Sequence, residues 1–280
     1  NIVAGLGDRA GAALSNHPEI NFMSFTGSPR VGTLVQQATA NHFVGCTLEL
    51  GGKSPQVIFA DADFEKAVPV IVRAIIQHAG QTCSAGSRIL VQKEIYNEFM
   101  KQVAAHFAKV RVGTPDMDLD CGPVMNAKQR NLVEGFREEA ISSGIELLSE
   151  GVFAEGLDQS GFWVKPALFG NVPRDHRLAC DEVFGPVLSA IPFEDELDAI
   201  KLANATDYGL VGSVWTKDGN RQQRVAKRMN CGQVFINNFG AGGGVELPFG
   251  GMKKSGHGRE KGFVALEHFT TTKTIVHYHE

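Results

Sequence analysis

Residues 55–92 decide the fold, and they read PQVIFADADFEKAVPVIVRAIIQHAGQTCSAGSRILVQ. Residues 55–59 form a short run rich in Val, Ile and Phe, which predicts a strand. Asp63 suits the N-cap of a helix, because apolar residues recur every three to four positions from 68 to 76. Residues 88–92 predict a second strand. The stretch is therefore a strand-helix-strand unit.

The same alternation continues in both directions along the chain. Further predicted strands are residues 21–25, 43–50, 163–169, 187–193, 210–215 and 233–237, and further predicted helices are residues 30–40, 96–109, 127–142, 196–205 and 221–229. Strands separated by helices predict an α/β fold, a mostly parallel sheet with helices on both faces. Residues 270–278 predict a terminal strand that joins a sheet or pairs with another subunit. Glycines punctuate residues 240–251, which predicts a loop that bends freely or approaches a ligand closely.

Composition narrows the class of protein. With 280 residues and 43% hydrophobic side chains, the chain can bury a substantial core. The net charge of −4 and the dispersed Lys and Arg favour neither a nucleic acid nor an acidic membrane as partner. No run approaches the ~20 apolar residues that cross a bilayer, and the first residues do not resemble a signal peptide.

The cysteines point to a reducing compartment. Five of them lie at least 37 residues apart with no CxxC pair, so a zinc site or a redox dithiol is not expected. The odd count argues against a disulfide scaffold. The cytoplasm is the default location. The five are Cys46, Cys83, Cys121, Cys180 and Cys231.

Two residues stand out as candidates for chemistry. Cys83 follows an amphipathic helix and lies among small and polar residues, whereas a structural Cys usually has apolar neighbours. Taken alone, it could be a packing residue or a nucleophile. Glu49 lies between two Leu at the end of a predicted strand, before Gly51-Gly52. It is either a strand residue facing water or a partly buried base with a raised pKa.

Two further segments could bind a cofactor. Glu182 and Phe184 lie two apart before Gly-Pro, so in an extended chain they point the same way and suit a ribose and a flat ring. An ordinary surface corner would use the same residues. Gly27 and Ser28 join a predicted strand to a predicted helix, where free N–H groups favour a phosphate. This junction is neither a Walker motif nor GxGxxG.

Taken together and in order, these segments resemble the aldehyde dehydrogenase superfamily. The matching motifs are Phe25-Thr-Gly-Ser28, Leu48-Glu-Leu-Gly-Gly-Lys53, Gly80-Gln-Thr-Cys83, Glu182-Val-Phe-Gly-Pro186, Pro248-Phe-Gly-Gly251 and Ser255-Gly-His-Gly-Arg-Glu260. They span residues 25 to 260, nearly the whole chain, and the 34-residue gap between Glu49 and Cys83 also matches the family.

The resemblance implies a role for each motif residue. Cys83 would attack the aldehyde as a thiolate and, after hydride transfer to the nicotinamide, hold a thioester. Glu49 would activate the water that hydrolyses this thioester. Within the family, Glu260 corresponds to a second acid that assists proton transfer, although an ion-paired Glu is the alternative. Phe249 would line the substrate entrance, although a packed Phe is equally ordinary.

The resemblance also implies the cofactor and its ligands. Gly27 and Ser28 would meet the pyrophosphate, Glu182 would hold the nicotinamide ribose, and Phe184 would pack near the ring. NAD is the expected cofactor, with NADP as the alternative, and the substrate is a small aldehyde. No metal is expected. The family implies a homodimer or homotetramer.

Length is the chief departure from the family. Its usual chain carries roughly two hundred further residues before Asn1, a size typical of a multi-domain enzyme. We therefore expect this sequence to be the C-terminal, catalytic portion. Residues 1–48 would be the remnant of a dinucleotide-binding domain, 49–250 the catalytic domain, and 251–280 a return segment with an oligomerisation strand. Alone, such a chain would have little or no activity.

Other readings remain open. A CoA-acylating or a semialdehyde dehydrogenase of the same superfamily would share these motifs, although Glu49 favours hydrolysis by water. A cysteine hydrolase would need a His base, and none of the nine His lies in a recognisable partner motif. An inactive truncated fragment is the non-catalytic alternative.

Overall fold

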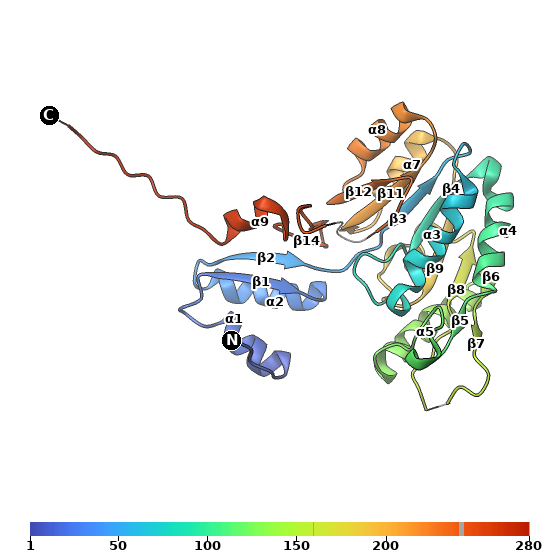
Figure 1. Ribbon diagram of the computed structural model, residues 1–280, viewed down its shortest axis with the longest axis horizontal. Helices are drawn as coiled ribbons and strands as arrows, with labels where there is room; N and C mark the ends of the chain where they lie inside the picture. The colour runs from blue at the N-terminus through green and yellow to red at the C-terminus, as the bar shows by residue number, and fades with distance from the viewer. Residues whose placement is uncertain (159, 241–243, 280) are drawn as a thin grey trace.

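A computed structural model describes residues 1–158, 160–240 and 244–279 of the chain. In this part of the chain, seven strands form the larger sheet (Figure 1). In spatial order they are β12 (Gln233–Ile236), β11 (Val211–Trp215), β3 (Pro55–Ile58), β4 (Arg88–Gln92), β9 (Val187–Phe193), β8 (Ala167–Gly170) and β6 (Glu146–Glu150). β6 runs antiparallel to β8, and the other neighbours run parallel.

The larger sheet is covered on both faces. Every residue of β3 is buried, and β4 and β9 are buried along nearly their whole length, which requires apolar cover on either side. The cover comes from α3 (Phe64–Ile76), α4 (Tyr96–Phe107), α5 (Ala127–Ser142), α7 (Glu196–Ala203) and α8 (Gly219–Arg228). The predicted α/β class with a mostly parallel sheet is confirmed.

The helix α3 follows from its sequence. The Asp63 carboxylate accepts a hydrogen bond from the Lys66 backbone N–H at 3.3 Å, so the predicted N-cap is confirmed. Its apolar stripe, including Ile71 and Ile75, is fully buried in the main core. After Ile76 the chain turns sharply toward residues 80–86.

A smaller sheet lies beside the larger one (Figure 1). β1 (Phe22–Thr26) runs parallel to β2 (Gly45–Glu49), and β14 (Gly256–His257) returns antiparallel to β2. The helix α2 (Pro29–Ala40) covers it, and Met23, Val35, Leu48 and Leu50 form a separate small core. The chain passes from β2 in the small sheet directly to β3 in the large one. The predicted domain boundaries remain a proposal.

Shorter elements complete the chain. They are a π-helix (Gly7–Gly11), α1 (Ala12–Ser15), α6 (Arg177–Cys180), α9 (Gly262–His268), 3-10 turns at Gln77–Gly80, Lys93–Ile95 and Pro115–Met117, and the strand pairs β10 (Tyr208–Gly209) with β13 (Met252–Lys253) and β5 (Arg111–Val112) with β7 (Val152–Phe153). Of the glycine-punctuated loop predicted at 240–251, residues 241–243 lie outside the described residues.

The C-terminal segment corrects one prediction. Residues 270–278 do not join a sheet of this chain and instead extend away from it (Figure 1). Their side chains are exposed, Ile275 and Val276 by 84% and 86%. A β-branched run favours extended backbone, but a strand also needs a partner for its N–H and C=O groups. Pairing with another subunit is therefore the part of the prediction that still stands as a proposal.

A membrane-spanning helix would have to be long and apolar. In the ranges that the structure describes, no helix meets both requirements.

Candidate active site

Glu49 ends β2 at the junction of the two sheets. The register places it opposite Thr26 of β1 on one side and Gly256 of β14 on the other. Its backbone carbonyl accepts a hydrogen bond from Gly27 N–H at 3.0 Å, and the next residue, Leu50, donates to Ser255 O at 3.1 Å. The backbone of the base candidate is therefore held from both sides.

The Glu49 carboxyl group is buried and unpaired. The residue is 2% exposed, and neither carboxylate oxygen has a hydrogen-bond partner in the described part of the chain. Burial raises the pKa of Glu49 to about 8, the nearby Glu260 adds to this rise, and Arg259 opposes it. Of the two readings of Glu49 that the sequence left open, the structure supports the buried carboxyl with a raised pKa. Such a group can accept a proton near neutral pH.

Cys83 lies in the loop between α3 and β4 and is partly buried. Just before it, His78 and Ala79 both adopt left-handed backbone, with φ of 53° and 54°. Such strain costs about 1–2 kcal/mol per residue and is often kept where it serves a site. Burial raises the pKa of the Cys83 thiol, and the carboxylates of Glu182 and Glu49 raise it further. The thiol therefore needs a base close by to become a thiolate.

Two glycines after Glu49 bring the candidate residues together. A Cβ on Gly52 would collide with the backbone carbonyl oxygen of Cys83, so the two segments touch through their backbones. A Cβ on Gly51 would collide with Oε2 of Glu182. At Gly52 the clash is with backbone, so only glycine fits there, whereas at Gly51 a Cβ would force the Glu182 side chain to move.

Glu182 is docked on this glycine pair. Its Oε1 accepts a hydrogen bond from Gly52 N–H at 2.9 Å. Burial raises the pKa of Glu182, and the Gly52 N–H and Lys53 oppose the rise. Phe184 has a left-handed φ of 52°, and its carbonyl accepts from the Gln129 amide at 2.8 Å. The segment is therefore turned at Phe184, so the extended backbone under which Glu182 and Phe184 would point the same way is not present.

Gly27 and Ser28 stand at the start of α2, as predicted. The Ser28 hydroxyl accepts a hydrogen bond from Val31 N–H at 3.4 Å, and Pro29 occupies the first helical position. Thr26, Gly27 and Ser28 are all exposed. A helix of this length with an open N-terminus fits an anionic group such as a phosphate.

Glu260 and Phe249 face each other as a backbone pair. Each donates its N–H to the carbonyl of the other at 2.7 Å. The Glu260 side chain accepts from the Ser24 hydroxyl of β1 at 2.7 Å, and the Lys261 ammonium lies 5.6 Å from the centre of the Phe249 ring. Glu260 is thus near Glu49, while its own carboxylate is bound to the small sheet.

Sequence reasoning missed several residues that build the site. Ser255 is fully buried, donates to Gly51 O at 2.6 Å and accepts from Gly209 N–H at 2.9 Å, which ties three segments together. Arg259 donates to Gly251 O at 3.0 Å. Ser255 and Arg259 both belong to the motif Ser255-Gly-His-Gly-Arg-Glu260, so that motif could have pointed to them. Gln129 lies outside them, and only the fold brings it to Phe184.

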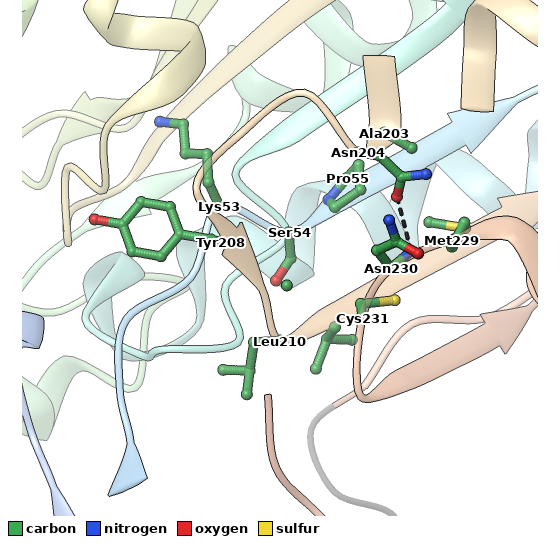
Figure 2. Close-up of a pocket in the computed structure, with 12 residues that line it drawn as sticks. Lys53, Ser54, Pro55, Ala203, Asn204, Tyr208, Leu210, Met229, Asn230 and Cys231 are labelled. Carbon is green, nitrogen blue, oxygen red and sulfur yellow. Dashed lines mark hydrogen bonds between the residues drawn. The ribbon is translucent and has the colours of Figure 1, made fainter. Parts of the chain in front are cut away.

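A small cavity lies at the start of β3 (Figure 2). Asn204, Tyr208, Asn230 and Lys53 are among its lining, and the Asn230 N–H donates to the Asn204 amide oxygen at 2.7 Å. The lining includes neither Cys83 nor Glu49. This cavity is therefore separate from the candidate active site at Cys83 and Glu49.

Comparison with known proteins identifies the family. A model of the aldehyde dehydrogenase family matches residues 1–275. This chain belongs to the aldehyde dehydrogenase family. Among curated proteins, it is 39% identical to the betaine aldehyde dehydrogenase of Bacillus subtilis over 98% of this chain and 56% of that protein. It is 40% identical to retinal dehydrogenase 2 of Mus musculus over 98% of this chain and 53% of that protein.

Solved structures agree with this aldehyde dehydrogenase assignment. A crystal structure from Burkholderia cenocepacia matches with a TM-score of 0.96 and 56% identity, over 98% of this chain and 58% of that one. The betaine aldehyde dehydrogenase of Staphylococcus aureus, solved in complex with NAD+, matches with a TM-score of 0.90 and 39% identity, over 95% and 53%. The chain thus spans little more than half the length of its aldehyde dehydrogenase relatives.

Proposed function

We propose that this chain carries the catalytic centre of an aldehyde dehydrogenase that oxidises a small-molecule aldehyde to a carboxylic acid. The observation that supports this most is Glu49 beside the Cys83 loop, a buried carboxyl with a pKa of about 8 and no hydrogen-bond partner among the described residues. A base of this pKa is matched to a thiol whose own pKa is raised. Membership of the family supplies the reaction class.

In the proposed reaction, Cys83 is the nucleophile. Glu49 takes the thiol proton, and the thiolate sulfur forms a bond to the aldehyde carbon. The backbone N–H groups of Cys83 and Ser84 oppose the rise in the thiol pKa and so favour the anionic sulfur. The substrate then remains bound to Cys83 as a thioester, and Glu49 releases the thiol proton to solvent. Glu49 next takes a proton from the water that cleaves the thioester, and this proton returns to the Cys83 sulfur. The acid leaves and the Cys83 thiol is restored.

NAD is the proposed cofactor, and NADP is the alternative. When bound, it accepts the hydride that the substrate loses. The residues present fit it: the start of α2 at Gly27 and Ser28 is open to a pyrophosphate, and the docked Glu182 can offer Oε2, which has no hydrogen-bond partner among the described residues, to ribose hydroxyls. A related protein was solved with NAD+, which favours NAD. Glu260 and Phe249 are proposed as the second acid and the lining of the entrance.

The proposal extends to the assembly and location of the protein. We propose a homodimer or homotetramer, in which residues 270–278 pair with another subunit, and a cytoplasmic location. Glu49 favours release of the product by water over transfer to CoA. Acyl-CoA formed from aldehyde, NAD and CoA would contradict that preference.

Labelling of cysteines tests the proposal. The complete protein is treated with limiting iodoacetamide, with and without NAD, and the modified peptides are mapped. We expect preferential modification of Cys83 over the other four cysteines, and a change of its rate with NAD. In parallel, Cys83→Ser should reduce NADH formation from NAD and a simple aldehyde to background. Equal labelling of all cysteines, or an active Cys83→Ser enzyme, would show that the nucleophile is assigned wrongly.

A further inference from the structure

The end of α3 presents an exposed arginine beside the Cys83 loop. Arg73 and Gln77 lie four residues apart on the same side of the helix end, and both are exposed. The Gly86 N–H donates to Ala74 O at 3.1 Å, so the loop that carries Cys83 returns along this end of the helix. The Arg73 guanidinium has no hydrogen-bond or ion-pair partner among the described residues. In this chain it is therefore available to a ligand.

Two cavities border this end of α3. The smaller has a volume of about 40 Å³, and its lining includes Thr82 and Ser84, the two neighbours of Cys83, whose hydroxyl oxygens lie 3.2 Å apart. The larger has a volume of about 700 Å³ and is lined by residues of α3 and by residues 106–120. Arg73 and Gln77 line both cavities. Arg73 is therefore shared by the larger cavity and the space beside the Cys83 loop.

The charges around the larger cavity favour an anion. Its lining carries two permanent cations, Arg73 and Lys109, and the imidazoles of His78 and His106. Asp120 is the one carboxylate in this lining among the described residues, and it already accepts a backbone N–H at 2.8 Å. The whole chain has a net charge of −4, so this local excess of positive charge runs against the average of the molecule. A cavity lined by one sign of charge attracts ligands of the other sign.

The wall beneath these cations is apolar. Pro69, Val72 and Ile76 of α3 contribute to it, and so does Val110 after α4. Binding sites for small molecules commonly combine an apolar wall with a few polar groups that fix the orientation of the ligand. The planar guanidinium of Arg73 can donate two parallel N–H groups to the two oxygens of a carboxylate. The cavity therefore fits a short hydrocarbon chain that ends in a carboxylate.

We propose that the aldehyde oxidised at Cys83 carries a carboxylate at its other end, and that Arg73 binds this carboxylate. The inference rests on the proposed function, in which Cys83 attacks the aldehyde, and it narrows the substrate class to semialdehydes. Three observations support it: Arg73 has no partner among the described residues, it lines both cavities, and the larger cavity is lined mainly by cations and apolar groups. An uncharged aldehyde would gain nothing from the guanidinium.

Matched pairs of aldehydes test the proposal in the complete protein. Succinic semialdehyde is compared with butanal, and adipic semialdehyde with hexanal, so that a carboxylate replaces a methyl group in each pair. The readout is kcat/KM for the aldehyde at saturating NAD. We expect the wild type to prefer the semialdehyde in at least one pair by about tenfold. Arg73→Met should remove that preference and leave kcat/KM for butanal and hexanal within about twofold of the wild type.

Further variants separate recognition of the carboxylate from folding. Arg73→Lys keeps the charge but loses the planar fork, so it should retain only part of the preference. Arg73→Gln replaces Arg73→Met if the latter does not fold. Arg228→Met is the matched control, because Arg228 is also an exposed arginine near the end of a helix, has no ion-pair partner among the described residues and lines neither cavity. It should leave the preference unchanged.

The outcomes distinguish the substrate class from the reaction. If the wild type shows no preference for either semialdehyde, or if folded Arg73 variants lose activity equally on all four aldehydes, the role of Arg73 is overturned while the proposed function stands. A larger dependence on Arg73 for glyceraldehyde 3-phosphate, relative to glyceraldehyde, would replace the carboxylate by a phosphate. If Cys83 is not labelled selectively and none of these aldehydes is oxidised, the proposed function fails and the inference falls with it.

Discussion

Glu49 carries its carboxyl group at a buried position, where carboxyl groups are rarely found. Charged side chains are rarely fully buried unless they are paired, yet both oxygens of Glu49 lack a partner in the described residues. The raised pKa resolves the conflict, because the neutral acid is far less costly to bury than the anion. Function and stability therefore place opposite demands on this one residue.

The rate of the reaction should depend on pH through Glu49. The base form of Glu49 is the anion, so activity should rise with pH up to about 8 and fall about tenfold for each unit below it. In Glu49→Gln this rise should be absent and the overall rate much lower. Steady-state rates across pH in the complete protein measure both. If the Glu49→Gln enzyme keeps the same pH profile, the group that titrates is not Glu49.

Stability should change in the opposite direction. The folded-state pKa of Glu49 is raised above its usual value of 4.5, so its contribution is fully present below about 4.5 and is lost as pH rises through about 8. Glu49→Gln cannot ionise and should be more stable than the wild type above that pH, by roughly 1–3 kcal/mol. Urea unfolding at about pH 5 and about pH 9 measures the difference. The exposed Glu65→Gln is the control and should show no such dependence.

At the scale of elements, the segment between β2 and β3 joins the two sheets and carries the site. Glu49 is the last residue of β2, and the Gly51-Gly52 pair and Lys53 follow it in this segment, all within five residues. The β14 return and Ser255 hold this segment from the other side. A change of geometry here should therefore affect chemistry more than global folding.

Gly51→Ala tests this expectation. The new methyl group would collide with Oε2 of Glu182, so that carboxylate must move. We expect the KM for NAD to rise about tenfold, with little change in the KM for the aldehyde. The matched control is Gly135→Ala in α5, where a Cβ meets nothing within 4 Å. It should add about 0.5–1 kcal/mol of stability, since Ala favours a helix. Unchanged NAD kinetics in Gly51→Ala would contradict the described docking of Glu182.

At the scale of the whole molecule, the C-terminal segment makes few contacts with the rest of the chain. Phe269 packs edge-on against Phe22 at 4.8 Å between ring centres, and beyond it residues 271–279 are exposed. An exposed β-branched segment is an available pairing partner. This supports the proposal that it pairs with another subunit.

Removal of residues 271–280 tests that proposal. In the complete protein we expect the deletion to lower the mass measured by analytical ultracentrifugation, because the proposed intersubunit pairing is lost. Far-ultraviolet circular dichroism should change little, since residues 271–279 form no helix or strand within this chain. A truncated protein of unchanged assembly would exclude the segment as the oligomerisation strand.

Much of the fold was predictable because hydrophobic periodicity is local. The strands β3 and β4 and the helix α3 with its Asp63 cap lie where their sequences predict them. Other features depend on partners far away in sequence. The segment 270–278 favours extended backbone but pairs with no strand among the described residues. The short strands β6 and β14 form because they pair with β8 and β2.

For the candidate site, the sequence by itself determined the residue types and their order: Cys83 after Glu49, and Glu182 with its Gly-Pro corner. Motifs are local and can be read along the chain. Only the tertiary structure decided that Glu49 is buried without a hydrogen-bond partner among the described residues, that Phe184 turns through left-handed backbone, and that the Glu182 carboxylate binds Gly52 N–H. Burial and charge proximity arise from segments more than a hundred residues apart, so no local pattern encodes them.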